Sequence, residues 1–250
     1  MPELPDVESA RKHIEARGLQ RRIAAVDDGD TYVSRPHAPG EIADALVGRE
    51  LVAAHRRGKA MWIETSEDGP ILGLHLGMAG RIAIDEEPAE RNWDRFVLHF
   101  EDGGTLALRD KRRLGRARLE PDIGALGPDA AEVDRARFRE LLARSRAPIK
   151  ARLMDQAVMA GVGNLMADEI LWRAHIDPRR PAAELDEAEG DRLWRDMRTV
   201  IRMSVRRGRA GVTELIPERR RGGLCPRCGA ALERAAVGGR TTYWCPREQR

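Results

Sequence analysis

The apolar residues of this chain change their spacing near residue 120, and this change constrains the fold more than any other feature. Between residues 20 and 120 they form short runs separated by Gly, Asp and Pro, such as AMWIET (60–65), RIAI (81–84) and TLALRD (105–110). Beyond residue 130 they recur at the helical period, as in FRELLAR (138–144) and LMADEILWRAH (165–175). The spacing therefore predicts an α+β chain of two domains, a β-sandwich followed by a helical bundle.

The same pattern predicts where the domains begin and end. Residues 5–17 predict an N-terminal helix, because Pro5 suits a first turn and Gly18 a stop. The segment PDIGALGPDA (121–130) contains two Pro and two Gly, which indicates an interdomain connection. The last residues are too poor in apolar side chains to form a core alone. We therefore expect domains at 1–122, 130–222 and 223–250.

Charge is distributed unevenly along the chain, although the net charge is only +3. Residues 201–250 contain 12 Arg and 4 acidic residues, and residues 109–118 contain six cations and one acidic residue. Such clusters suggest a polyanionic partner, nucleic acid first, and a solvated basic tail is the alternative. No run of 18 apolar residues and no signal peptide is visible, so we expect a cytoplasmic protein that acts as a monomer.

The three cysteines all lie in the last 26 residues, which suits a metal site better than a disulfide framework. Cys225 and Cys228 form one C-x2-C knuckle, and Cys245 begins a second whose last position is Glu248. Three thiolates and a carboxylate can hold zinc in a closed, structural site. This predicts a zinc-stabilised hairpin, and a hairpin that forms without metal is the alternative. Arg240 in this hairpin is suited to contacting a phosphate.

The N-terminus offers a nucleophile. A small second residue favours removal of Met1, and the chain then begins with the secondary amine of Pro2. An α-amino group titrates at about pH 8, so a fraction is neutral at neutral pH and can attack an aldehyde-like carbon. Glu3 is adjacent and can act as an acid or a base. A Pro-Glu start alone is common, and it gains meaning only from motifs elsewhere in the chain.

Motifs along the whole chain resemble those of the formamidopyrimidine-DNA glycosylase and endonuclease VIII family, and PELP resembles its first branch. The resemblance implies a β-sandwich with an N-terminal helix, a helix-two-turn-helix domain and a zinc-finger hairpin. The matching segments keep the family's order: PELPDVE (2–8), RGK (57–59), HLGMAGR (75–81), DKRRLG (110–115), DQ (155–156), GVGN (161–164), ADE (167–169) and the cysteine hairpin.

The resemblance also implies a bifunctional enzyme that removes damaged bases from duplex DNA and then cleaves the strand. Pro2 would attack C1′ of the damaged nucleoside, expel the base and form an iminium, with Glu3 relaying protons. Successive β- and δ-elimination would follow, because the iminium acidifies the neighbouring C2′–H. Lys59 corresponds to the family's lysine near the scissile phosphate, and an exposed charge at a strand end is the alternative.

The damaged base must leave the stack, and a wedge of side chains has to fill the gap. By resemblance the wedge consists of Met78, Arg112 and Leu114, with Arg112 facing the orphaned base and Arg113 beside it on the DNA. Leu114 occupies a position where the family usually has an aromatic residue. A leucine stacks less well on a base, so the preference for the base opposite the lesion stays open.

Phosphate contacts are implied for residues of both predicted domains. The helix start at residue 164 offers backbone N–H groups to an anion beside two glycines, although an ordinary turn between helices is the alternative. Asp168 and Glu169 are expected to complement the helix dipole and to pack. The implied phosphate ligands are Lys59, His75, Lys150, Asn164 and Arg240.

Two readings besides the enzyme stay open from the sequence. One is a damage-binding protein of the same fold without catalysis, which Leu114, Glu248 and the short segment 207–224 leave possible. The other is an RNA-binding protein, which the basic hairpin alone suggests. The segment 207–224 contains no obvious lid for 8-oxoguanine, so formamidopyrimidines, oxidised pyrimidines, hydantoins and bulkier adducts are all candidate lesions.

Overall fold

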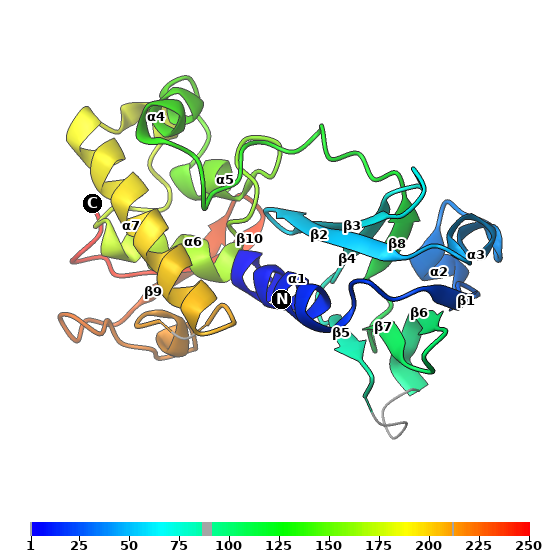
Figure 1. Ribbon diagram of the computed structural model, residues 1–250. Coiled ribbons are helices and arrows are strands. Elements are labelled where there is room, and N and C mark those ends of the chain that lie inside the picture. Colours follow the sequence, from blue (N-terminus) through cyan, green and yellow to red (C-terminus); the bar gives the residue numbers. More distant parts are fainter. Residues whose placement is uncertain (1, 87–91, 212) are drawn as a thin grey trace. The chain divides into compact units, whose positions relative to one another are not determined.

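The computed structural model describes residues 2–86, 92–211 and 213–250 (Figure 1). The chain divides into two compact units. The first contains Pro2 and residues 6–123, and the second contains residues 3–5 and 124–250. Within the described residues, no helix combines the length and the apolar content needed to cross a membrane.

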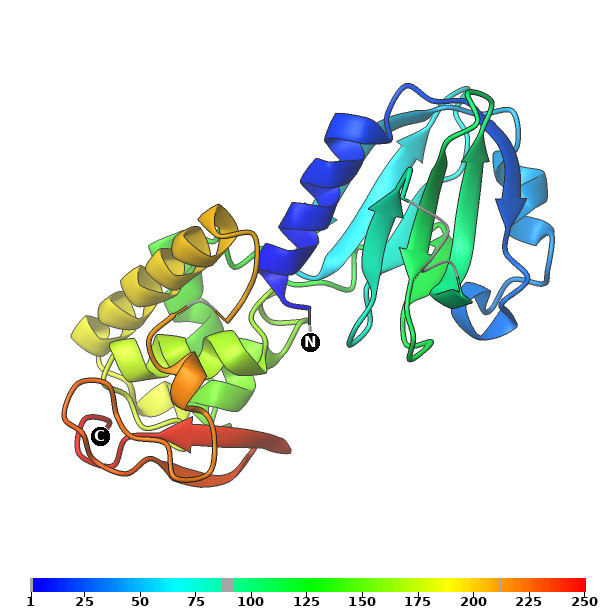
Figure 2. The same ribbon diagram turned by 90° about the horizontal axis from the view of Figure 1, so that it is seen from below.

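Two four-stranded antiparallel sheets form the first unit, and Figure 2 shows their strands. The predicted runs at 60–65 and 81–84 coincide with strands β3 and β5. One sheet has the order β1-β6-β7-β5, with β1 (Ile23–Asp27), β6 (Asp94–Phe100), β7 (Thr105–Arg109) and β5 (Arg81–Ile84). The other has the order β2-β3-β4-β8, with β2 (Leu51–Arg57), β3 (Ala60–Thr65), β4 (Leu72–His75) and β8 (Arg116–Leu119).

Alternating burial explains how these strands make a sandwich. In β3, Met61 and Ile63 are buried in the core, whereas Trp62 points to the opposite face of the sheet. The same core includes Val7 and Ile14 of helix α1 (Leu4–Arg17), so this helix packs on the sandwich through its apolar side. The prediction of an N-terminal helix and a β-sandwich is therefore confirmed.

Two short helices, α2 (Thr31–Ser34) and α3 (Glu41–Leu46), interrupt the β-rich region, and the apolar pattern did not predict them. Helices of four and six residues are too short to show a period. Carboxylates instead cap the first turns of these helices. Asp30 accepts a hydrogen bond from the N–H of Tyr32, and buried Asp28 accepts hydrogen bonds from the backbone of α3.

The second unit consists of helices around one apolar core, with a β-hairpin at its C-terminal end. Helix α5 ends at Met154, because Asp155 adopts an extended backbone and a turn follows. The elements are α4 (Arg135–Ala143), α5 (Ile149–Met154), α6 (Asn164–Arg173), the 3-10 turns η2 (Ala182–Glu184) and η3 (Ile216–Glu218), α7 (Glu187–Arg206), β9 (Glu233–Val237) and β10 (Arg240–Trp244).

Replacing Asp28 by Ala should lower the free energy of unfolding by about 1–3 kcal/mol, because buried backbone N–H groups lose their acceptor. Urea unfolding measures the change. Asp44→Ala, in the exposed first turn of α3, is the matched control and should change stability by less than about 0.5 kcal/mol. Equal losses in both variants would contradict the capping role of Asp28.

Candidate active site and nucleic-acid interface

The carboxylate of Glu3 caps helix α6. Glu3 is fully buried, and its oxygens accept hydrogen bonds from the backbone N–H groups of Gly163 (3.0 Å), Leu165 (2.8 Å) and Met166 (3.2 Å). N–H groups at a helix start have no partner within the helix, and the helix dipole there favours a negative charge. This end of α6 therefore stabilises an ionised carboxylate out of contact with bulk water.

Gly163 is required for this contact. A Cβ atom at this position would lie 2.3 Å from the carboxyl carbon of Glu3, far inside van der Waals contact. The carbonyl of Gly161 also accepts from the N–H of Leu4 at 3.3 Å. The glycines thus admit the N-terminal segment of the chain to the start of α6. The predicted phosphate contact at these backbone groups is wrong, because Glu3 already occupies them.

Pro2 precedes Glu3 in the chain, and Asn164 begins the helix that Glu3 caps. Pro2 is partly exposed, and its covalent bond to the anchored Glu3 restricts the positions open to its amine. Asn164, the first residue of α6, is also partly exposed, and its Oδ1 is buried without a hydrogen-bond partner among the described residues. An unsatisfied amide oxygen of this kind is costly in a finished interior and is typical of binding sites.

One buried carboxylate fixes the backbone conformation of the loop that follows β7. Asp110 accepts hydrogen bonds from the backbone N–H groups of Arg112 (2.9 Å), Leu114 (2.7 Å) and Gly115 (2.7 Å). The side chain of Arg112 is exposed, and that of Leu114 is partly exposed. Asp110 therefore fixes the backbone of this loop while leaving its side chains available to a ligand.

The two predicted wedge loops touch each other. Gly77 has a φ of +58°, and a Cβ atom there would lie 2.4 Å from the backbone carbon of Leu114. Met78 follows Gly77 and is 42% exposed, which is unusual for so apolar a side chain. The structure therefore brings the loop that contains Met78 against the loop that contains Leu114, although these two residues lie 36 positions apart in the sequence.

The basic run 109–118 does not form one continuous surface. Arg109 is buried and pairs with Asp94 at 2.5 Å and with Glu86 at 3.1 Å. Arg113, which we predicted to contact DNA, forms a two-pronged pair with Asp30 at 2.7 and 2.9 Å. This pair lowers the pKa of Asp30, although partial burial opposes the shift. Arg109 is therefore a structural residue, whereas Arg113 keeps an exposed side chain beside Asp30, and its contact with DNA stays a prediction.

Lys59 and His75 lie close together at the edge of the sheet β2-β3-β4-β8. Lys59 connects β2 to β3, and His75 ends β4. Desolvation lowers the pKa of His75, and the positive charge of Lys59 lowers it further. The Nδ1 atom of His75 accepts the N–H of Gly77 at 3.0 Å. A neutral imidazole that accepts at Nδ1 carries its proton on Nε2, where it can donate to a phosphate oxygen.

Lys150, which we predicted to contact DNA, has no exposed surface. Its Nζ atom lies 2.6 Å from Asp168 and donates to the hydroxyl of Thr242 at 2.7 Å. Asp168 also pairs with Arg219 at 2.7 Å and accepts the N–H of Tyr243 at 3.1 Å. Lys150 therefore cannot reach a phosphate in this conformation. It helps Asp168 to fix the hairpin β9–β10 on helix α6, a role beyond the packing that we expected for Asp168.

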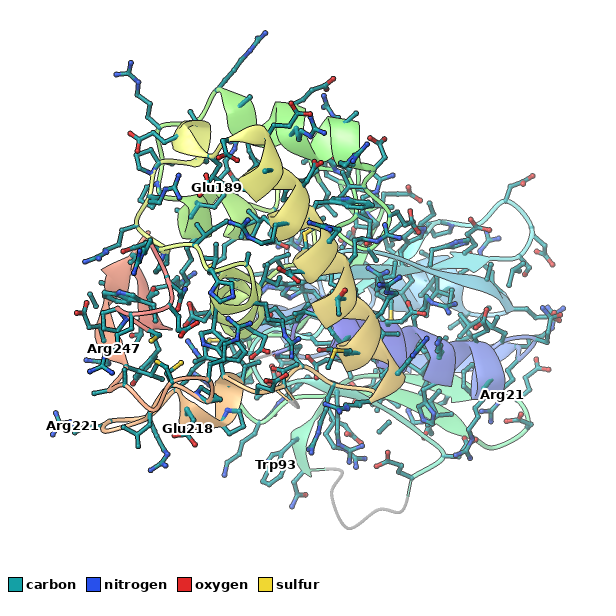
Figure 3. The ribbon with its side chains drawn as sticks, turned by 90° about the vertical axis from the view of Figure 1, so that its left-hand side faces the viewer. Arg21, Trp93, Glu189, Glu218, Arg221 and Arg247 are labelled. Carbon is teal, nitrogen blue, oxygen red and sulfur yellow. The ribbon has the colours of Figure 1, made fainter. Side chains whose placement is uncertain are left out.

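The segment 207–224 is tied to the same helix. Buried Glu169 accepts the backbone N–H of Leu215 at 2.8 Å and that of Glu214 at 3.3 Å. Figure 3 labels Glu218 and Arg221 in the part of this segment that leads to the cysteines, where Arg221 is exposed. These bonds tie residues 214 and 215 of the segment to α6.

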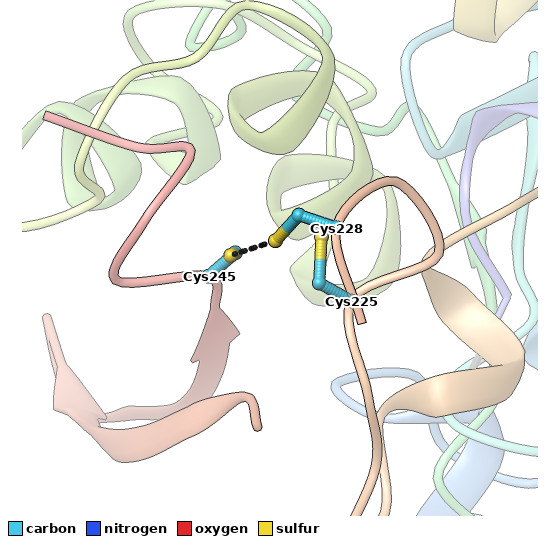
Figure 4. A group of neighbouring side chains, drawn as sticks. All are labelled: Cys225, Cys228 and Cys245. Carbon is cyan, nitrogen blue, oxygen red and sulfur yellow. Dashed lines mark hydrogen bonds between the residues drawn. The ribbon is translucent and has the colours of Figure 1, made fainter. Parts of the chain in front are cut away.

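The hairpin β9–β10 presents Arg240 and gathers the cysteines. Arg240 is exposed at the start of β10, directly after the turn Gly238–Gly239. The sulfur atoms of Cys225, Cys228 and Cys245 lie within 4.8 Å of one another, and Figure 4 shows Cys228 and Cys245 facing at 3.5 Å. Three converging sulfurs are the donor set that zinc prefers.

The surroundings of the cysteines fit a metal-bound thiolate. The indole N–H of Trp172 lies 3.4 Å from the sulfur of Cys225. Burial raises the pKa of Cys225, but this hydrogen bond and those from two backbone N–H groups outweigh burial and lower it. Burial raises the pKa of Cys245 to about 11, so binding of a cation must displace its proton. The side chains therefore provide three ligands for a structural zinc ion.

Glu248 is not among the ligand atoms that converge in the described residues. Its Oε2 atom lies 3.4 Å from Nδ1 of His175, and its backbone carbonyl lies 3.1 Å from the same nitrogen. Glu248 as the fourth ligand stays a prediction, and it requires the carboxylate to turn from His175 toward the sulfurs.

The chain thus combines a helix capped by Glu3, an exposed Met78 beside the loop of Leu114, and a hairpin with three converging cysteines, the features expected of a protein that acts on nucleic acid. Sequence profiles agree with this class over almost the whole chain. The formamidopyrimidine-DNA glycosylase N-terminal domain matches residues 1–117, the H2TH domain of the same family matches residues 125–215, and the zinc finger found in FPG and IleRS matches residues 222–247.

Individual relatives support the same assignment. Formamidopyrimidine-DNA glycosylase of Roseiflexus sp. is 35% identical over the full length of both chains, and that of Chloroflexus aurantiacus is 34% identical over 98% of this chain and 96% of the relative. A crystal structure of Lactococcus lactis Fpg (MutM) with DNA containing N7-benzyl-Fapy-dG has a TM-score of 0.87 and 27% identity, with full coverage of both chains. This chain belongs to the formamidopyrimidine-DNA glycosylase family.

Purified protein should contain about one zinc ion per chain, because the three thiolates converge on one position. Elemental analysis of the dialysed protein measures the metal, and Cys228→Ser should remove most of it. If Glu248 completes the ligand set, Glu248→Ala should lower the zinc content after exposure to a chelator, whereas Glu233→Ala on exposed β9 should not. Full retention in Glu248→Ala would exclude the carboxylate as a ligand.

Proposed function

We propose that this family member, a DNA glycosylase and abasic-site lyase of base-excision repair, works through the amine of Pro2. The observation that carries the proposal is the cap of α6 by Glu3. It places a buried carboxylate next to the only secondary amine that the chain can present once Met1 is removed. An amine nucleophile needs a fixed position and a nearby proton acceptor, and Glu3 supports both.

The reaction begins when the Pro2 nitrogen attacks C1′ of the damaged nucleoside. The glycosidic bond breaks, its electron pair leaves with the base, and the base takes up a proton. The nitrogen then loses its proton, and the C1′–O4′ bond breaks as O4′ takes up a proton, which gives an iminium between Pro2 and C1′. The cationic iminium withdraws electrons, so the C2′ proton is lost and the 3′ phosphate leaves, followed by the 5′ phosphate in a second elimination. Glu3 stabilises the cation and accepts protons.

The wedge and the phosphate ligands position the damaged duplex. Met78 and Leu114 fill the gap left by the extruded base, and Arg112 faces the orphaned partner. Lys59, His75, Asn164 and Arg240 bind the phosphates. The close approach of Gly77 to the backbone of Leu114 supports this assignment, as do the exposed positions of Arg112 and Arg240.

The lesion class follows from the relatives and from the segment 207–224. The named relatives are formamidopyrimidine-DNA glycosylases, and we propose ring-opened purines as the first substrates. Because Glu169 binds the backbone of residues 214 and 215 to α6, few residues of this segment are left to form a lid over 8-oxoguanine. The enzyme acts as a monomer in the cytoplasm, where the damaged DNA lies.

Borohydride should trap a covalent complex between the wild-type protein and DNA with an abasic site, because it reduces the iminium. Pro2→Gly should reduce trapping strongly, and Gly163→Ala should do so by at least tenfold, because the added methyl group displaces Glu3. Gly190→Ala, in α7 with no atom closer than 3.9 Å, is the matched control. Absence of a complex with the wild-type protein would contradict the mechanism and favour a damage-binding protein.

Met78→Ala should impair excision from duplex DNA more than cleavage of single-stranded abasic DNA, since only a duplex leaves a gap to fill. Single-turnover rates on the two substrates measure the difference, and we expect a ratio of at least tenfold. Met203→Ala, in the partly buried last turns of α7, controls for the loss of a thioether. Equal losses on both substrates would contradict the wedge role.

A further inference from the structure

A pocket of about 350 Å³ opens on the first unit, on the face of the sheet β2-β3-β4-β8 that points away from the sandwich core. The proposed reaction uses only one of its lining residues, His75. The others include Trp62 of β3, Arg116 and Arg118 of β8, and Pro121 from the segment that follows β8. This pocket therefore needs an explanation of its own.

Strand register creates the pocket. Trp62 pairs with Gly73 on β4, and Gly73 pairs with Arg118 on β8, so a residue without a side chain separates an indole from a guanidinium. Pro121 crosses directly above Gly73, where a Cβ atom would lie 2.7 Å from the proline ring. The proline ring thus covers the sheet at Gly73, and the pocket opens beside it, with an apolar wall at Trp62 and a cationic wall at Arg116 and Arg118.

The cationic wall is poor in acidic partners. Among residues 2–86, 92–211 and 213–250, no carboxylate forms an ion pair with Arg35, Arg116 or Arg118. Arg35 and Arg116 lie over the exposed ring of Tyr32, with 4.2 and 5.2 Å from each guanidinium carbon to the ring centre. Burial lowers the pKa of Arg116, and the charges of Arg35 and Arg118 lower it further. A bound anion would relieve this repulsion.

The apolar wall is suited to a flat ring. The indole of Trp62 stacks on the imidazole of His55 with 5.6 Å between ring centres and 22° between planes, which fixes its orientation in advance. Ile123 and the ring of Pro121 line the same space. A pocket of this size holds one nucleobase with its sugar, and stacking on an indole is a sequence-tolerant way to hold a base.

We propose that this pocket binds a nucleotide, with the phosphate on Arg116 and Arg118 and the base against Trp62. The lining carries two guanidinium groups and one carboxylate, Asp122, so its charge suits a single phosphate. A phosphate ester of this kind can come from a free nucleotide or from a strand of the DNA substrate. The site goes beyond base excision, because neither Trp62 nor the two arginines take part in that reaction.

Calorimetric titration of the full-length protein at low salt tests the proposal. The probes are deoxyadenosine monophosphate, inorganic phosphate and a single-stranded pentanucleotide of thymidine. Arg118→Gln should weaken binding of every probe that enters the pocket by at least tenfold, since a charge-assisted hydrogen bond is lost. Trp62→Leu should weaken the nucleotide by a similar factor and leave phosphate unchanged. Arg137→Gln on exposed α4 is the matched control and should have no effect.

The outcomes separate the two sources of the ligand. Loss of mononucleotide binding in both pocket variants supports a free nucleotide, and loss of pentanucleotide binding alone supports a strand of DNA. Binding that is equal in all variants, or absent with every probe, would overturn the proposal. Arg118→Lys should recover part of the affinity, which a misfolded sheet would not allow. Pro2→Gly should keep nucleotide binding while losing borohydride trapping, so failure of the catalytic proposal is distinguishable from failure of this one.

Discussion

The cap of helix α6 by Glu3 is the interaction on which the catalytic arrangement depends. It joins the third residue of the chain to a helix that begins 161 positions later. The hydrogen bonds satisfy N–H groups that would otherwise be unpaired and hold a charge where the helix dipole favours it. Because Pro2 is bonded to Glu3, this contact restricts the position of the proposed nucleophile. Removing the glycine at 163 would abolish it by sterics alone.

A second buried carboxylate organises the hairpin β9–β10. Asp168 receives Lys150, Arg219 and the backbone of β10, so three separate segments meet at one charge. Charges this deeply buried are costly unless they are fully paired, and here each partner comes from a different part of the chain. The position of Arg240 at the tip of the hairpin depends on this network. The three cysteines hold the opposite end of the same hairpin.

Much of the candidate site could be predicted from local sequence. The strands at 60–65 and 81–84, the N-terminal helix and the cysteine knuckles each have a short-range signature, and the structure contains all of them. The residues with which the charged side chains form ion pairs could not be predicted in this way. Lys150 was predicted as a phosphate ligand because the sequence does not show whether a cation faces solvent or a buried carboxylate, and the Asp30 partner of the exposed Arg113 was equally invisible. The acidic partners lie 18 and 83 positions away, where no local rule connects them.

The sequence by itself determined the order of the elements, the family and the residues able to do chemistry, because apolar spacing and short motifs act locally. Only the tertiary structure decided which of those residues reach a ligand. Glu3 takes the helix N–H groups that a phosphate was expected to use, Asp168 takes the buried Lys150, and Pro121 packs on Gly73 between Trp62 and Arg118. Each of these depends on segments that folding brings together, and packing and charge pairing there decide what remains available to DNA.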